Sequence, residues 1–181
     1  MSSSIFIFQD KYNASYKKDS TLFLKSILSK HFNQNIVKII RTENGKPFLK
    51  NGPFFSISHS HEKIILALSF KHPVGVDIEY INPHLPFKKI AKKFFSPQDL
   101  TTMDDSPESF YHIWTQKEAF VKLLGKGILM PEFQNHQHPN IEYQTLNMHN
   151  YAGHVCFDPS SSQASMSQFD EDHGYKGNEY A

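Results

Sequence analysis

The sequence predicts an α+β fold of two similar halves, each a small antiparallel sheet packed with helices. Strand-like runs and amphipathic helical runs occur together in residues 1–72, and again in residues 73–157. A chain of 181 residues is long enough for one ordinary core, or for two small halves that share one. We see no internal repeat in the sequence itself.

In the first half, four short apolar or β-branched runs predict strands near residues 5–8, 36–40, 54–58 and 64–70. A helix is expected over residues 20–32, because its apolar side chains recur at helical spacing. Asn44-Gly45 is a turn signal, and a polar loop over residues 59–63 is expected to join the last two strands.

The second half begins with a predicted strand over residues 75–80, followed by a helix over residues 86–95 that Ser96-Pro97 ends. Ser106 is a suitable N-cap for a longer helix that Gly125 ends. Strands near 141–145 and 151–157 are expected to complete the core. Residues 158–181 contain no Leu, Ile or Val, so we expect a disordered polar tail.

Composition indicates a soluble globular chain, with 39% hydrophobic and 20% charged residues. A single cysteine, Cys156, excludes an internal disulfide framework and is expected in the core. No apolar run approaches the ~20 residues that cross a bilayer, and the Met-Ser-Ser-Ser start lacks a secretory layout, so we expect a cytoplasmic protein without membrane contact. Residues 1–50 carry nine Lys/Arg and three Asp/Glu, which suits an acidic or phosphate-rich partner or is simply a solvated lysine surface.

Two acidic residues alternate along the predicted strand Gly75-Val76-Asp77-Ile78-Glu79. Residues two apart in a strand share a face, so Asp77 and Glu79 project together while Val76 and Ile78 anchor the other face. Neighbouring carboxylates repel unless a cation or proton lies between them, and Mg²⁺ prefers such oxygen ligands. The alternative is an ordinary surface strand edge.

Two further groups of residues invite a chemical interpretation. In the helix containing Trp114-Thr115-Gln116-Lys117-Glu118, residues Glu118 and Lys122 share one face, where a surface ion pair is the simpler interpretation. The run Ser56-Ile57-Ser58-His59-Ser60-His61, preceded by Gly45-Lys46-Pro47-Phe48, offers phosphate ligands or only solvated loop side chains. His136 and His138 have metal-like spacing without a third ligand, so a loop is expected there.

Taken in order, Gly-Lys-Pro, Phe-x-x-Ser-His-Ser, Gly-Val-Asp-Ile-Glu and Trp-x-x-Lys-Glu-Ala-x-x-Lys resemble the 4'-phosphopantetheinyl transferases over about residues 44–127. The mid-chain position of Asp77 resembles the long, pseudo-duplicated class typified by the surfactin-synthetase activator. This resemblance implies a pseudo-dimeric α+β fold, with a metal site in the half formed by residues 73–157.

The resemblance also implies a reaction, in which 4'-phosphopantetheine passes from coenzyme A to a serine of an apo acyl carrier protein or peptidyl carrier domain. Asp77, Glu79 and Glu118 would hold Mg²⁺, and Glu118 and Lys122 would be catalytic. Lys46, Ser58, His59 and Lys122 would bind coenzyme A. A monomer that binds neither nucleic acid nor membrane is expected.

The stretch 86–100 resembles the segment that the family places beside its acidic carrier protein, and it carries four lysines, namely Lys88, Lys89, Lys92 and Lys93. Arg41 is the only arginine before Gly45, whereas the family usually clamps the 3'-phosphate with arginines there; Lys17 and Lys18 are the candidate substitutes. Gln98 stands where an acid is common, which predicts a weaker helix cap or carrier contact. The competing hypothesis is a catalytically impaired relative that only binds carrier protein or coenzyme A.

Overall fold

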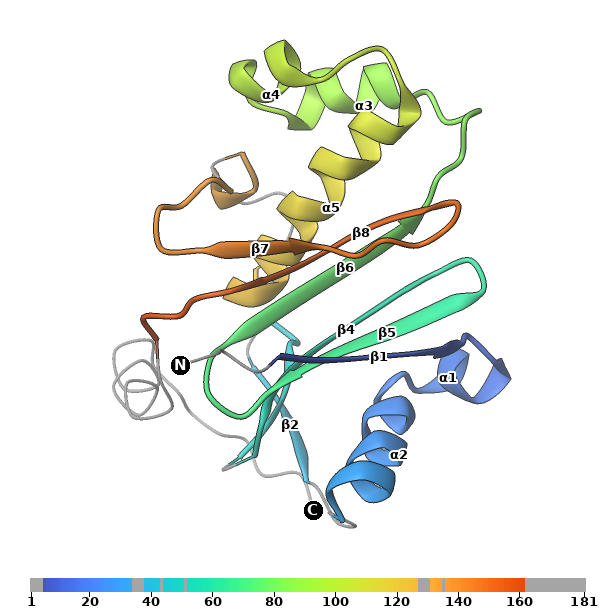
Figure 1. Ribbon diagram of the computed structural model, residues 1–181, viewed down its shortest axis with the longest axis vertical. Helices are drawn as coiled ribbons and strands as arrows, with labels where there is room; N and C mark the ends of the chain where they lie inside the picture. The colour runs from blue at the N-terminus through green and yellow to red at the C-terminus, as the bar shows by residue number, and fades with distance from the viewer. Residues whose placement is uncertain are drawn as a thin grey trace.

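The computed structural model describes residues 5–33, 38–42, 44–50, 52–126, 131–134 and 136–161 and shows an α+β fold (Figure 1). Its strands form a three-stranded antiparallel sheet in the order β1-β5-β4, a two-stranded β2-β3 ribbon, and a second three-stranded antiparallel sheet in the order β6-β8-β7. The predicted fold class, small antiparallel sheets packed with helices, is confirmed.

The central strand of the first sheet, β5, is buried on both faces. The elements of this part of the chain are β1 Ile5–Lys11, α1 Ala14–Lys18, α2 Thr21–Phe32, β2 Ile39–Arg41, β3 Pro47–Leu49, β4 Phe54–Ser60 and β5 Lys63–Ser69. Leu66 and Leu68 of β5 pack against Leu24 and Leu28 of α2. The intervening Ala67 points to the other side, where it packs with residues of the second sheet. The two sheets therefore share part of one core.

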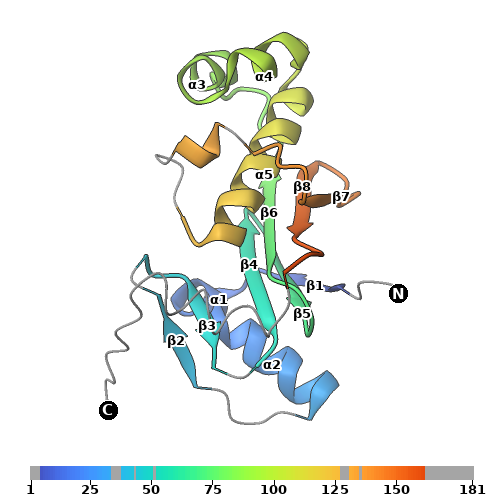
Figure 2. The ribbon, with the colours of Figure 1, turned by 90° about the vertical axis from the view of Figure 1, so that its left-hand side faces the viewer.

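The second sheet is covered by one long helix (Figure 2). The elements are β6 Val74–Tyr80, α3 Phe87–Phe94, α4 Pro97–Thr102, α5 Pro107–Leu124, the 3₁₀ turn Pro131–Phe133, β7 Glu142–Thr145 and β8 Tyr151–Phe157. As predicted, Ser106 caps α5 and Gly125 ends it, with φ of 68°. A side chain at Gly75 would collide with the Ala119 carbonyl oxygen, so this glycine allows α5 to lie directly on β6.

Serine hydroxyls join the two sheets. Alternate residues of β4 face β6, and the Oγ atoms of Ser56, Ser58 and Ser60 accept hydrogen bonds from the backbone N–H groups of residues 76, 78 and 80. The three N···O distances are 3.1, 3.3 and 3.0 Å. We call this row the serine ladder; it satisfies N–H groups of β6 that have no strand partner on that side in the sheet pairings.

Replacing Ser56 with Ala is expected to lower the free energy of unfolding by about 1–3 kcal/mol, because the Val76 N–H group stays buried without an acceptor. Urea denaturation measures this change. The exposed Ser15→Ala in α1 is the matched control, expected to change stability by no more than about 0.5 kcal/mol. Equal stability of the two variants would show that the serine ladder does not hold the sheets together.

Several boundaries differ from the predicted ones. The expected polar loop 59–63 is only a tight turn at His61 and Glu62, because β4 continues to Ser60 and β5 starts at Lys63. Ser96-Pro97 does end α3, but it also begins α4 with a complete capping box between Ser96 and Asp99. The expected cap weakness from Gln98 is therefore wrong, since Asp99 supplies the capping carboxylate.

Other expectations fall wholly or partly outside the described residues. The strand predicted over 36–40 is described only as β2, from Ile39. The polar tail is described up to Ser161, whose carbonyl oxygen lies 2.6 Å from His72 Nδ1; residues 162–181 are outside the described part. In the described ranges, no helix has both the length and the apolar character needed to cross a membrane.

Candidate active site

Six of the seven predicted site residues line one pocket of about 320 Å³. It lies between β4, β6, α5 and the start of α2, and it contains Ser58, His59, Asp77, Glu79, Glu118 and Lys122, together with Ser20 and Ile57. Acidic groups from two distant stretches of the chain therefore line the same pocket.

Local geometry explains how each side chain reaches the pocket. Asp77 and Glu79 share one face of β6, whereas Val76 and Ile78 are fully buried on the other. Glu118 and Lys122 are one helical turn apart on α5, which lies on β6. The strand alternation and the helical spacing thus direct four charged groups into one space.

Lys122, Ser58 and Asp77 form a triangle of mutual hydrogen bonds. The Lys122 ammonium lies 2.6 Å from Asp77 Oδ1 and donates a second hydrogen bond to Ser58 Oγ at 2.9 Å. The Ser58 hydroxyl in turn donates to Asp77 Oδ1 at 2.8 Å, and Ser60 donates to Glu79 Oε2 at 2.7 Å. The serine ladder therefore orients both carboxylates of β6.

The pocket holds more negative charge than Lys122 can neutralise. Burial, followed by the charges of Asp77 and Glu79, raises the pKa of Glu118 to about 7, despite the opposing effect of Lys122. Burial and the Asp77 charge also raise the pKa of Glu79, against the hydrogen bond from Ser60. Such a site favours the arrival of either a proton or a cation.

The donor set fits a magnesium ion. Asp77 Oδ2 is buried and has no hydrogen-bond partner in the described structure, so one acceptor oxygen remains available. Carboxylate oxygens are the ligands that Mg²⁺ prefers. As the side chains are placed, no group of three His, Cys, Asp or Glu residues among those described converges closely enough to hold a metal, and Lys122 already occupies Asp77 Oδ1.

Lys46, the seventh predicted residue, does not line this pocket. Its ammonium donates a hydrogen bond to the Leu123 carbonyl oxygen at 2.8 Å, at the end of α5. Burial lowers the pKa of Lys46 to about 8. In this structure the lysine of the Gly-Lys-Pro motif caps a helix C-terminus, where positive charge is favourable.

Sequence reasoning missed two neighbours of the pocket. The Tyr12 ring stacks on His59 with ring centres 4.2 Å apart, and Lys17 of α1 lies 6.0 Å from the centre of the Tyr12 ring. Burial and the nearby Lys122 charge lower the pKa of His59. Ser20, at the start of α2, lines the pocket as well. No pattern in the sequence indicated that Tyr12 would stack on His59.

Lys117, adjacent to Glu118, belongs to a different network. It is fully buried, and its ammonium lies 2.7 Å from Asp99 Oδ2 and 3.0 Å from the Phe133 carbonyl oxygen. His136 Nδ1 lies 3.2 Å from the Lys117 ammonium, so His136 is a buried partner of Lys117. Both His136 and His138 lie in a loop, as predicted, and His138 is exposed. Cys156 is buried, as expected.

Comparison with known proteins matches the part of the chain that contains Asp77, Glu79, Glu118 and Lys122. The sequence model of the 4'-phosphopantetheinyl transferase superfamily matches residues 73–176. A 4'-phosphopantetheinyl transferase of Bacillus subtilis is 41% identical over 96 residues, which are 49% of this chain and 42% of the relative.

Two further relatives match similar stretches. The 4'-phosphopantetheinyl transferase Sfp of Bacillus subtilis (strain 168) is 33% identical over 119 residues, 61% of this chain and 52% of the relative. The 4'-phosphopantetheinyl transferase AcpT of Escherichia coli O157:H7 is 37% identical over 116 residues, 60% of this chain and 59% of the relative. The chain thus spans about half the length of the curated relatives it matches.

Proposed function

Because the chain belongs to the 4'-phosphopantetheinyl transferase superfamily, we propose that it transfers 4'-phosphopantetheine from coenzyme A to a serine of an apo acyl carrier protein or peptidyl carrier domain. The second product is 3',5'-ADP. The observation that carries this proposal is the meeting of Asp77, Glu79, Glu118 and Lys122 in one pocket. Three carboxylates in one pocket, of which Asp77 is buried and the other two half-buried, are otherwise hard to reconcile with a purely structural role.

Each side chain has a part in this reaction. Asp77, Glu79 and Glu118 would hold Mg²⁺, which supplies positive charge to the pyrophosphate of coenzyme A. Lys122 stabilises the charge that grows on the departing 3',5'-ADP, and Ser58 keeps its ammonium in place. Glu118 lines the same pocket as the Lys122 ammonium, so it is also the candidate general base for the proton of the carrier serine.

The nucleotide half of coenzyme A is assigned to the other wall of the pocket. His59, supported by the Tyr12 ring, lies on that wall, and Lys17 and Lys18 of α1 add charge near it. Arg41 donates to the Gly45 carbonyl oxygen at 3.0 Å. In the absence of an arginine clamp, we expect lysines to contact the 3'-phosphate. Lys46 joins them only if it leaves the Leu123 carbonyl group.

The carrier protein is assigned to α3. This helix buries Phe87 and Ala91 and exposes its four lysines, of which Lys88 pairs with Asp105 at 2.9 Å. An exposed basic helix suits an acidic carrier through long-range attraction. A boundary between the halves at residues 72 and 73, a monomeric state and a cytoplasmic location complete the proposal.

The test is a reaction of the chain with coenzyme A, magnesium and several apo carrier proteins, followed by mass spectrometry of each carrier. A gain of one phosphopantetheine that disappears with a magnesium chelator is expected. Asp77→Asn should abolish the gain, whereas Asp10→Asn, at an exposed position of β1, should retain it. Unchanged carrier mass, with the carrier still bound, would instead support the non-catalytic alternative.

A further inference from the structure

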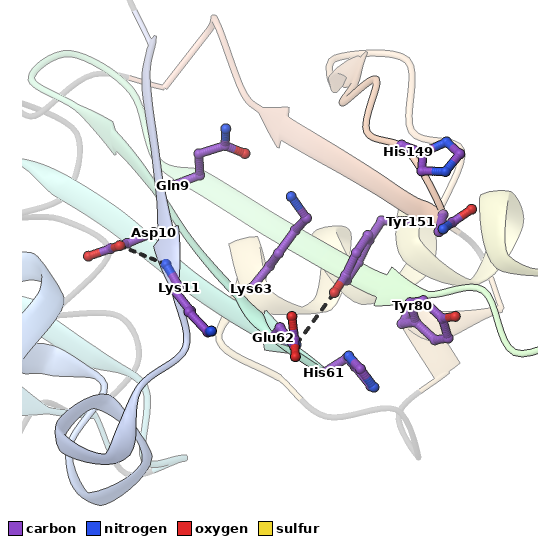
Figure 3. A pocket seen from close by; sticks show the side chains of 10 residues that line it. Gln9, Asp10, Lys11, His61, Glu62, Lys63, Tyr80, His149 and Tyr151 are labelled. Atoms are coloured by element: carbon purple, nitrogen blue, oxygen red, sulfur yellow. Dashed lines mark hydrogen bonds between the residues drawn. The ribbon is translucent and has the colours of Figure 1, made fainter.

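A second pocket, of about 480 Å³, lies where the tips of two hairpins meet the end of β1 (Figure 3). The β4-β5 turn and the segment leading into β8 form two of its walls, so residues of both sheets line it. It shares no residue with the carboxylate pocket. Its volume is in the range of small-molecule sites, although it is open to solvent.

Two lysines of neighbouring strands line this pocket. Lys11 of β1 and Lys63 of β5 are direct cross-strand partners, so their side chains leave the same face of the sheet. Like charges directly opposite one another destabilise a sheet. Among the described residues, neither ammonium forms an ion pair; Lys63 Nζ instead lies 5.3 Å from the centre of the Tyr151 ring.

The lining also contains two acidic residues, Asp10 and Glu62. Asp10 points to the opposite side of β1 from Lys11, as Figure 3 shows, and its carboxylate accepts hydrogen bonds from Tyr16 Oη and from the Lys11 N–H group. Glu62 is exposed at the tip of the β4-β5 turn. Its backbone N–H group donates to Tyr151 Oη at 3.4 Å. Of the two acidic residues in the described lining, Glu62 is therefore the one not turned to that opposite side of β1.

Aromatic rings form the rest of the pocket. The rings of Tyr80 and Tyr151 meet edge to face with centres 5.4 Å apart, and His61 stacks on Tyr80 at 4.7 Å. Tyr80 and Tyr151 are themselves cross-strand partners of β6 and β8. Charged groups on one side and ring surfaces on the other suit a ligand with an acidic group and a flat body.

We propose that this pocket binds a small organic oxyanion, a phosphate monoester or a carboxylate with a flat apolar body. Lys11 and Lys63 hold the acidic group, which relieves their mutual repulsion. Tyr80 and Tyr151 contact the body. Because the walls come from both sheets, bound ligand also stabilises their association.

The experiment titrates the ¹⁵N-labelled chain with phenyl phosphate, benzoate and the neutral control benzyl alcohol, and follows backbone amide shifts. Saturable shifts at residues 61–63 and 149–151 are expected with the anions and not with benzyl alcohol. Lys11→Gln combined with Lys63→Gln should weaken binding by about tenfold or more. Glu62→Gln should strengthen it, and Lys71→Gln, at the far end of β5, should leave it unchanged.

The same titration can overturn the proposal. Undiminished affinity in the double variant, equal binding of benzyl alcohol, or shifts confined to His59 and Lys122 would each do so. Comparing phenyl phosphate with benzoate tells which acidic group is preferred. Neither coenzyme A nor a carrier protein enters the measurement, so its outcome is independent of the proposed transferase reaction.

Discussion

Glu118→Gln is expected to reduce turnover on a carrier protein by about 10²–10⁴-fold, the contribution typical of a general base. Glutamine has the same shape but neither accepts the serine proton nor offers a charged oxygen to a metal ion. The fold should survive, because burial and two neighbouring carboxylates already disfavour the charged form of Glu118. We expect thermal stability that is unchanged or higher, together with the loss of activity.

Steady-state kinetics with an apo carrier protein, combined with thermal unfolding, measures both effects. Glu108→Gln, an exposed substitution in the first turn of the same helix, is the matched control and should retain turnover. Near-normal turnover of Glu118→Gln would remove Glu118 from the mechanism. A large loss of stability would show that Glu118 has a structural role instead.

Lys117→Met is expected to lower the free energy of unfolding by about 3–5 kcal/mol, because it leaves the buried Asp99 carboxylate without its partner. Both side chains are at most 5% exposed, so water cannot replace the lost ion pair. Adding Asp99→Asn should recover part of the loss, since the uncompensated charge is then removed. Urea denaturation of the single and double variants measures both changes.

Lys88→Met is the matched control for this prediction. It breaks an ion pair of similar length, 2.9 Å between Lys88 Nζ and Asp105 Oδ1, but the side chains of this pair are 56% and 87% exposed. Such surface pairs contribute about 0–1 kcal/mol. If Lys117→Met cost no more than Lys88→Met, the buried pair would not be what ties α4 and the turn at Phe133 to α5.

Most of the described strands and the long helices follow from the sequence because their signals are local, whereas the short strand β3 was not predicted. Alternating apolar residues predicted β6, and a serine cap, helical spacing and a final glycine predicted α5 to within a residue or two. Alternation also placed Asp77 and Glu79 on one face. Whether that face met Glu118 depended on packing between elements, which only the ordered motifs of a known family indicated.

Contacts between elements were the part that the sequence could not predict. Lys46 and Lys117 both belong to recognisable motifs, yet one caps α5 and the other pairs with Asp99, because tertiary packing decides which partner a long side chain reaches. The alternation of serines at 56, 58 and 60 was visible in the sequence. A loop was expected after residue 58, so the continuation of β4 and its hydrogen bonds to β6 were missed.

The hydroxyl of Ser58 accepts a hydrogen bond from the Ile78 N–H group of β6 and donates one to the Asp77 carboxylate of the same strand. The packing of β4 on β6 therefore also orients the Asp77 carboxylate in the pocket. A fragment of residues 73–157 would keep Asp77, Glu79, Glu118 and Lys122 but would lack the hydrogen bond from Ser58 to Asp77. A chimera that joins residues 73–157 to a different N-terminal half would need hydroxyl side chains at the positions of Ser56, Ser58 and Ser60.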